Sequence, residues 1–366
     1  MNGTAHDRHR SGRHQRRRRV GRSHVRLVTT LLLSLFVAGR LWAGGQSENA
    51  YDANEEFIPA IKPVELAAGE RLRVVATTNI IGDVLSEVAG ETTDVTTLMP
   101  AGQNPHGYTP TPSALGSVER AHIVYVNGFG LEEGLLDEIR STATGPIVPL
   151  SAGIEPLAGN DEEHGDDDDH DGGAAQNDEH DDHDHEAVDP HVWMDPNNVI
   201  VWVENMVSTL SAADPANAQT YRKNGDRYID RLQEIDSEIR TRVARIPPER
   251  RKLVLDHELF SYFADEYGFQ VVGAIVPDTS DSAEPSARDV AQLVELIRRE
   301  QVPALFVGET ASRGLHSLAG AIAEELGGQI KVLPTLTGSL ATPGEPGDTY
   351  LGFIRYNVNQ VVTGLQ

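Results

Sequence analysis

Three histidines in ordered stretches of this sequence could together bind a metal ion. His106 lies in NPHGYTPTPS, His191 in DPHVWMDPNN and His257 in LVLDHELFSYF. The chain contains no cysteine, so thiolate metal sites and cysteine nucleophiles are excluded, and a transition-metal site must use His, Asp, Glu and water. No two of these histidines are near neighbours in sequence, so only a fold that joins distant segments could bring them together.

Two of these histidines, His106 and His257, lie where an α/β protein often places ligands. Prolines surround His106 in a loop between a predicted strand and a predicted helix, and His257 follows a short apolar strand. His191 lies between two Asp-Pro pairs, so Asp189 or Asp195 could hold the ring nitrogen that faces away from a metal ion. The alternatives are an idle solvent-exposed loop histidine, a turn in which the Asp residues only cap the chain, and a buried ring paired with another group.

A second group of histidines lies in an acidic low-complexity segment. Residues 161–189 contain no Lys or Arg and cannot bury a core, so residues 160–188 are predicted to form a disordered loop. The histidines of this segment are His164, His170, His180, His183 and His185. We interpret them as an accessory zinc collector, weaker than a preformed site because binding must order the loop. The alternative is a solubilising spacer.

The elements that must position these histidines alternate between strands and helices. Short apolar runs such as RLRVVATTN and HIVYVNG alternate with helical runs such as IIGDVLSEVAGE, and the same alternation resumes after residue 250. This pattern predicts an α/β fold with two similar lobes, each a mostly parallel sheet flanked by helices. If the three histidines converge, they can do so only where the two lobes meet, so a metal cleft would lie between the lobes.

One long helix is predicted from Pro215 to Ile246, with Asp214 as its N-cap and Pro215 at its first position. A helix of this length could be a spine that joins the two lobes; the alternative is one long core helix within a single domain. Its apolar stripe consists of Tyr221, Gly225, Tyr228, Leu232, Ile235, Ile239, Val243 and Ile246.

The N-terminal residues differ from the rest of the chain. They are rich in Arg and contain an apolar run, Leu27 to Gly39, that is too short to be a committed membrane span. We interpret residues 1–43 as an export signal cut after Ala43, with an uncleaved N-terminal anchor as the alternative. The exported protein would be periplasmic or bound at the cell surface, without a lipid on cysteine. The predicted divisions are 44–70 as a flexible mature N-terminus, 71–212 as the N-terminal lobe, 213–247 as the linking helix and 248–366 as the C-terminal lobe.

The net charge of the chain is −25 at pH 7. This balance disfavours nucleic acid and anionic membrane surfaces as partners and suits cations.

Four motifs together resemble one family. NPHGYTPTPS, DPHVWMDPNN, SAADPANAQTYRKN and DHELFSYFADEYGFQVVG occur in the order and spacing of the metal-binding solute-binding proteins of ABC importers, particularly the zinc-specific branch. The resemblance covers roughly residues 70–366. It implies a monomeric receptor that binds one Zn²⁺ in the cleft and delivers it to a membrane permease driven by a cytoplasmic ATPase. His106, His191 and His257 match the ligand positions of that family.

The sequence departs from the family at a fourth ligand position. Gly338 stands where many members, especially manganese binders, carry an Asp. Three histidines without that carboxylate favour Zn²⁺, whereas Mn²⁺ favours more oxygen donors, so a manganese or other divalent-metal receptor is the alternative. Glu258, Glu309 and Asp348 are candidates for a fourth ligand.

Other function classes compete with a receptor. Three histidines and an open position are also the arrangement of a catalytic zinc site. A zinc-dependent hydrolase is disfavoured because the chain has no HExxH-like pair and no carboxylate that the sequence places as a general base. We therefore predict that the protein is not an enzyme. An extracellular adhesin is a third class, and these residues neither support nor exclude it.

Overall fold

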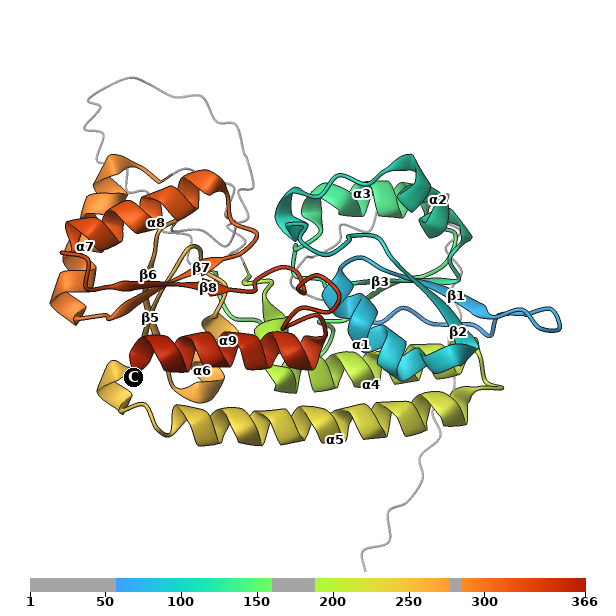
Figure 1. Cartoon of the computed structure of the whole chain (residues 1–366). Coiled ribbons are helices and arrows are strands. Elements are labelled where there is room, and N and C mark those ends of the chain that lie inside the picture. Colours follow the sequence, from blue (N-terminus) through green and yellow to red (C-terminus); the bar gives the residue numbers. More distant parts are fainter. Residues whose placement is uncertain (1–56, 160–187, 277–284) are drawn as a thin grey trace, which may run out of the picture. The chain divides into compact units, whose positions relative to one another are not determined.

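The computed structural model describes residues 57–159, 188–276 and 285–366 (Figure 1). The predicted export signal, part of the predicted flexible N-terminus and all five histidines of the acidic segment lie outside these residues. All of these residues belong to one compact unit.

The first sheet has four parallel strands in the order β2-β1-β3-β4. These strands are β1 (Leu72–Ala76), β2 (Thr93–Thr97), β3 (Ile123–Val126) and β4 (Ile147–Pro149). The inner strand β3 is buried along its whole length, as expected for a parallel strand covered on both faces.

The second sheet repeats this topology, with four parallel strands in the order β6-β5-β7-β8. They are β5 (Lys252–Leu255), β6 (Gln270–Ala274), β7 (Ala304–Gly308) and β8 (Lys331–Thr335). The two sheets confirm the predicted fold class of two similar α/β lobes.

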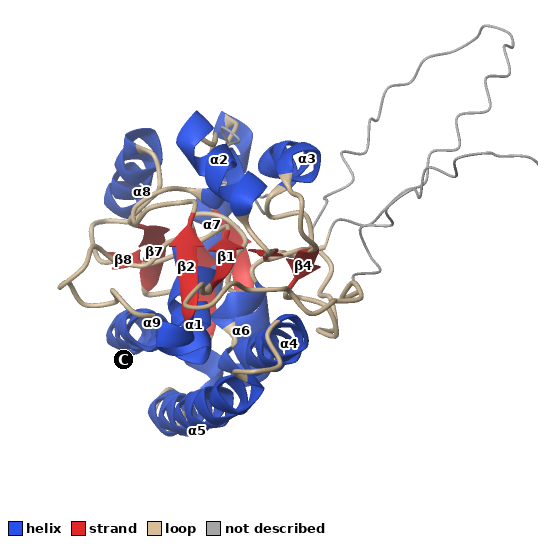
Figure 2. Ribbon diagram, turned by 90° about the vertical axis from the view of Figure 1, so that its right-hand side faces the viewer, coloured by secondary structure: helices blue, strands red, loops and turns tan. Residues whose placement is uncertain are grey.

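Helices cover both faces of the sheets. The helices are α1 (Asn79–Ala89), α2 (Pro112–Arg120), α3 (Glu133–Thr142), α4 (Pro196–Ala213), α5 (Ala218–Val243), α6 (Ser261–Tyr267), α7 (Ala287–Glu300), α8 (Arg313–Glu325) and α9 (Tyr350–Leu365). Short 3₁₀ turns span Gly90–Thr92, Pro105–Gly107, Val192–Met194 and Pro248–Arg250. Figure 2 shows the strands as a middle layer, with α2, α3 and α8 on one side, α1, α4 and α9 on the other, and α5 outermost. Within the described residues, no helix combines the length and the apolar character that crossing a membrane requires.

The predicted long helix is α5, which joins the two lobes. It contacts α1 and α4 of the first lobe and α9 of the second. The seven predicted stripe residues from Tyr221 to Val243 are buried on α5 and confirm the stripe. The predicted end is wrong, because the helix ends at Val243 and Ile246 is buried beyond it.

The predicted start of α5 is wrong by a few residues. Asn217, not Asp214, occupies the N-cap position. The carboxylate of Asp214 instead accepts hydrogen bonds from Asn217 Nδ2 at 2.7 Å and from the Tyr221 hydroxyl at 2.8 Å. Because these side chains occupy the carboxylate, residues 215–217 form a turn and the helix begins after them.

Helix α4 is not among the predicted elements, although the sequence contains a signal for its start. It begins at Pro196, and the side chain of the preceding Asp195 accepts a hydrogen bond from the Asn197 amide at 2.9 Å. Asp at the N-cap followed by Pro at the first helical position is a helix-start signal that the Asp-Pro-Asn-Asn stretch carries. Helix α4 therefore starts directly after the segment that contains His191.

Candidate metal centre

The structure brings His106, His191 and His257 together. His106 lies in the 3₁₀ turn after β2, His191 directly precedes the turn Val192–Met194, and His257 follows the end of β5. Each ring offers one nitrogen, and these nitrogens all lie within 4.8 Å of one another. The fold thus joins three segments that are far apart in sequence.

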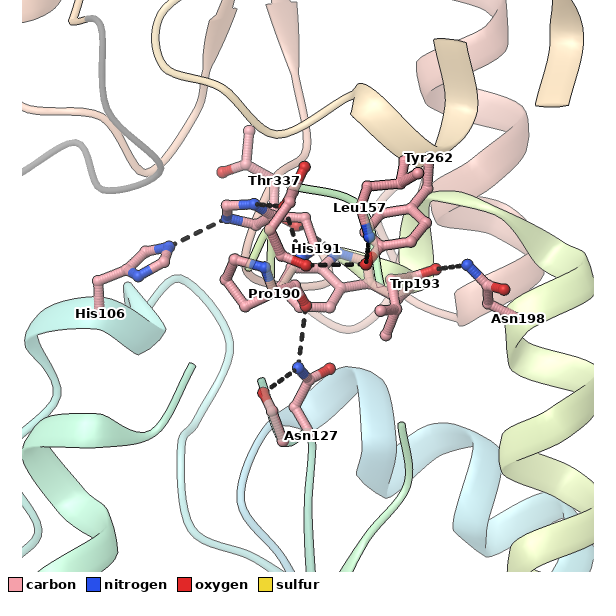
Figure 3. Close-up of polar contacts among 12 residues, drawn as sticks. His106, Asn127, Leu157, Pro190, His191, Trp193, Asn198, Tyr262 and Thr337 are labelled. Carbon is pink, nitrogen blue, oxygen red and sulfur yellow. Dashed lines mark hydrogen bonds and ion pairs between the residues drawn. The ribbon is translucent and has the colours of Figure 1, made fainter. Parts of the chain in front are cut away.

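The spacing of the nitrogens suits a single ion. Nε2 of His106 lies 3.1 Å from Nε2 of His191, and Figure 3 shows the two rings reaching toward each other. An ion bonded tetrahedrally at about 2.1 Å holds two ligand nitrogens about 3.4 Å apart. The ring centroids of His191 and His257 are 5.5 Å apart, and those of His106 and His257 are 6.1 Å apart. Small ring movements would therefore bring all three nitrogens onto one ion.

The surroundings of His106 favour its neutral form. His191 and His257 are buried, with 1% and 4% of their surface exposed, whereas His106 is half-buried. Burial, followed by the charges of His191 and His257, lowers the pKa of His106 to about 2. A neutral imidazole keeps the lone pair that a metal ion requires.

Asp189 orients the ring of His191. Its Oδ1 accepts hydrogen bonds from His191 Nδ1 at 2.7 Å and from the His191 amide at 2.9 Å. Burial alone would raise the pKa of Asp189, but His191 and these hydrogen bonds outweigh burial and lower it. The ionised carboxylate leaves Nε2 of His191 facing the other histidines. Of the two aspartates that sequence offered for this role, Asp189 contacts the ring and Asp195 caps α4.

Asp256 lies beside the ring of His257, as Asp189 lies beside the ring of His191. The sequence analysis does not predict this role for Asp256. Its Oδ1 lies 3.3 Å from His257 Nδ1, and its Oδ2 accepts a hydrogen bond from the Gly308 amide at 2.9 Å. Burial would raise the pKa of Asp256, yet the adjacent His257 and the amide contacts lower it. The Asp-His dipeptide was the available signal, because a carboxylate on the outer nitrogen is usual for a metal-binding histidine.

Residues from both lobes hold the segment that carries His191. Trp193 Nε1 donates to the Thr337 carbonyl at 3.0 Å, and the Tyr350 hydroxyl donates to the Trp193 carbonyl at 2.9 Å. Asn127 Nδ2 donates to the Pro190 carbonyl at 2.9 Å, as Figure 3 shows. These contacts hold the residues on either side of His191, whereas its ring is held by Asp189.

The described residues place no carboxylate among the clustered ligand atoms, which come from the three histidines alone. Glu309 is exposed and accepts a hydrogen bond from the Tyr356 hydroxyl at 2.8 Å. Asp348 is exposed and accepts one from the Gly344 amide at 2.8 Å. Glu258 is half-buried beside His257, outside the cluster.

Gly338 packs directly against the residue before His106. A Cβ atom at Gly338 would lie 2.3 Å from Cδ and 2.7 Å from Cγ of Pro105. Those distances are far shorter than any van der Waals contact, so a side chain at position 338 would require Pro105 or the Gly338 segment to shift.

The ends of the acidic segment lie close to the centre. Its histidines are outside the described residues, but Ala158 and Val188, which flank residues 160–187, pair in an antiparallel bridge. The Asp189 amide also donates to the Leu157 carbonyl at 2.9 Å. The segment is therefore attached a few residues from His191.

The sequence matches one protein family and several characterised relatives. Residues 74–364 match the family described as zinc-uptake complex component A, periplasmic (ZnuA). The manganese-binding lipoprotein MntA of Halalkalibacterium halodurans is 30% identical over 298 residues, which is 81% of this chain and 89% of the relative. The manganese ABC transporter substrate-binding lipoprotein PsaA of Streptococcus mitis is 29% identical, over 82% of this chain and 91% of the relative.

Solved structures share the fold. The Mn-bound periplasmic metal binding protein from Candidatus Liberibacter asiaticus has a TM-score of 0.68 and 25% identity, covering 81% of this chain and all (100%) of that one. The periplasmic zinc binding protein TroA from Treponema pallidum also has a TM-score of 0.68, with 24% identity over 81% of this chain and 99% of that one.

Proposed function

The chain belongs to the ZnuA family of periplasmic metal-binding receptors of ABC transporters, and we propose that it is a receptor for Zn²⁺. The proposal rests on this membership and on the geometry of the centre. The members of this family are receptors and not enzymes. In this proposal His106, His191 and His257 bind one Zn²⁺ as cargo, and the loaded protein delivers it to the permease.

The set of donor atoms is the observation that favours Zn²⁺ as the cargo. The clustered ligand atoms of the described residues are three imidazole nitrogens, which Zn²⁺ accepts readily. Mn²⁺ favours carboxylate, carbonyl and water oxygens. Pro105 fills the space beside Gly338, where a side chain could otherwise supply an oxygen donor. Water then completes the coordination of the ion.

Manganese is the second candidate cargo, because several relatives are named for it. MntA and PsaA carry manganese in their names, and a relative from Streptococcus pyogenes serotype M1 is named for iron. A site of three histidines and several waters could accept these ions with lower affinity.

The proposal places the receptor outside the cytoplasm as a monomer, with residues 1–43 as the export signal. The first relatives are named lipoproteins, whereas this chain has no cysteine that could carry a lipid. Its attachment to the membrane, if any, would therefore differ from theirs, and an uncleaved N-terminal anchor is the alternative to free release.

The acidic segment is proposed as an accessory collector of Zn²⁺. Its attachment beside His191 supports this role, because ions held there would be released close to the centre. Deleting residues 161–186 should lower the number of weakly bound Zn²⁺ ions and leave the tight ion in place. Equal stoichiometry in the intact and shortened proteins would identify the segment as a spacer.

Metal titration of the purified, metal-stripped protein tests the main proposal. We expect one tight Zn²⁺ and at least a 100-fold preference for Zn²⁺ over Mn²⁺ in competition. The substitutions His106→Ala, His191→Ala and His257→Ala should each weaken Zn²⁺ binding about 100-fold or more. The exposed His316 is the matched control, and His316→Ala should bind like the wild type. Tighter binding of Mn²⁺ would overturn the choice of zinc, and absence of any tight ion would overturn the receptor.

A further inference from the structure

The His106 loop, defined as residues 98–107, carries the most exposed histidine of the centre. Its start is fixed to the first sheet, because the amides of Leu98 and Met99 donate to the carbonyls of Ala76 and Thr77 at 2.9 and 3.0 Å. His106 itself lies at the far end of the loop, beyond these bonds. Additional contacts must therefore hold it over the two buried histidines.

Those contacts come from the other lobe. In the middle of the loop, the Gly102 amide donates to Ser339 Oγ at 2.8 Å. At its end, the ring of Pro105 packs against Gly338, the neighbour of Ser339. The loop from the N-terminal lobe therefore rests on the segment that follows β8 of the C-terminal lobe.

Ser339 is a buried junction of three hydrogen bonds, with 2% of its surface exposed. Besides the bond from Gly102, its hydroxyl accepts one from Asn79 Nδ2 at 2.8 Å and donates to the Leu340 carbonyl at 2.9 Å. Asn79 Oδ1 in turn accepts a bond from the Leu340 amide at 2.9 Å. Asn79 begins α1, so this junction also ties the first helix of the N-terminal lobe to the same segment.

We propose that Ser339 is a positioning residue that sets how long the protein retains its metal ion, because its hydroxyl holds the His106 loop against the C-terminal lobe. The inference rests on the proposed function, since it concerns the ion bound by the three histidines. Ser339 does not touch that ion and acts through His106. Loss of the hydroxyl leaves the Gly102 amide and the Asn79 amide group without their acceptor, which loosens the loop.

Loss of the Ser339 hydroxyl should change the rate at which the metal ion dissociates. His191 and His257 are buried, His191 is hydrogen-bonded to Asp189, and His257 lies 3.3 Å from the Asp256 carboxylate. We therefore expect the more exposed His106 to be the ligand whose departure opens the site. In Ser339→Ala the dissociation rate of Zn²⁺ should rise about tenfold, which corresponds to about 1.4 kcal/mol. The association rate should change less than the dissociation rate, as is usual for mutants of one binding site.

The experiment follows metal release by stopped flow, with the full protein loaded with Zn²⁺, and in parallel with Mn²⁺, and mixed with excess coloured chelator. Asn79→Ala should also speed release. The double variant Asn79→Ala/Ser339→Ala should release metal more slowly than the sum of the two free-energy effects predicts, because both residues act on one junction. In a His106→Ala background, Ser339→Ala should have no further effect. That last result separates positioning of His106 from a general loss of structure.

The matched control is Thr93→Val. Thr93 is a buried hydroxyl that bonds to the Tyr221 hydroxyl at 3.1 Å, away from the three histidines, so this variant should lower thermal stability without changing metal release. A wild-type dissociation rate in a folded Ser339→Ala protein would overturn the inference, as would an equal acceleration in Thr93→Val or in the His106→Ala background. If the wild type held neither ion tightly, the proposed function itself would fail, which is a separate outcome.

Discussion

The Oδ1 atom of Asp189 accepts two hydrogen bonds from the same residue, from His191 Nδ1 at 2.7 Å and from the His191 amide at 2.9 Å. The hydrogen bond from the His191 amide closes a turn of the kind that Asp forms with the residue two positions later. The Asp-Pro-His stretch thus builds its own turn, and the same carboxylate that makes the turn directs the imidazole. Local sequence therefore sets the orientation of His191 before the lobes contribute anything.

Substitutions at Asp189 should show how much its role as hydrogen-bond acceptor and its charge each contribute to Zn²⁺ binding. Asp189→Ala removes the acceptor, so Zn²⁺ affinity should fall about 10- to 100-fold. Asp189→Asn keeps an oxygen acceptor and removes the charge, so its loss should be smaller. Isothermal titration with a competing chelator measures both. Asp195→Asn is the control, since Asp195 caps α4, and affinity should stay at the wild-type value. An Asp189→Ala protein with unchanged affinity would contradict the orienting role.

Elements with a regular apolar period could be predicted from sequence. The predicted stripe is correct from Tyr221 to Val243, because burial there follows from helix geometry, whereas Ile246 lies beyond the end of α5. The start of helix α2, Pro112–Arg120, also follows from local sequence, because Thr111 caps it and Pro stands at its first position. The start of α5 could not be predicted, because Asp214 binds two side chains and the sequence does not show that competition.

The centre was only partly visible in the sequence. Each histidine stood out by its prolines or its neighbouring Asp, yet nothing local shows that the three rings meet, because their distance depends on how the two sheets are placed. The contact between Gly338 and Pro105 was also hidden, since it joins the two lobes. Sequence can mark the residues of such a site, whereas their convergence is a property of the fold.

The packing of α5 on α4 depends on Gly225. A Cβ atom there would lie 2.5 Å from Val207 Cγ2. Gly225→Ala should therefore destabilise the protein by about 1 kcal/mol, since overpacking of about 1–3 kcal/mol exceeds the gain in helix propensity of about 1 kcal/mol. Urea unfolding measures this. In Gly225→Ala/Val207→Ala the clash is absent, and stability should recover. Failure of the second substitution to restore stability would show that the helices do not meet as described.

Asp83 should make stability depend on pH. Burial raises its pKa to about 6, while the hydrogen bond from the Tyr350 amide opposes this rise. The folded state therefore binds this proton more tightly than the unfolded state, whose pKa is about 4. Between about pH 4 and pH 6 the folded protein holds more protons, so the free energy of unfolding falls as pH rises through this window.

Asp83→Asn removes this contribution and keeps an acceptor for the Tyr350 amide. Above pH 6 the variant should be more stable than the wild type by about 1 kcal/mol, a value reduced for partial exposure to solvent, and the two proteins should converge near pH 4. Urea unfolding of metal-free protein at several pH values measures the difference. Asp195, whose pKa burial also raises to about 6, is present in both proteins and cancels in the comparison. A stability difference that does not vary with pH would contradict the assignment.

Gly338 should control the position of His106. In Gly338→Ala the new methyl group meets the Pro105 ring, so the His106 turn must move away from the other two histidines. We expect Zn²⁺ affinity to fall about tenfold and stability to fall by about 1–3 kcal/mol. Chelator competition and thermal unfolding measure the two effects in the same preparation.

The second substitution Pro105→Ala removes the ring that the methyl group meets. In Gly338→Ala/Pro105→Ala, affinity should therefore return most of the way to that of Pro105→Ala alone. The same reasoning extends to Gly338→Asp: a carboxylate can approach the centre only when the proline ring is absent, so Gly338→Asp/Pro105→Ala should gain Mn²⁺ affinity while Gly338→Asp alone should not. A gain of Mn²⁺ binding in the single variant would mean that the ring yields easily and that Pro105 does not restrict the choice of metal.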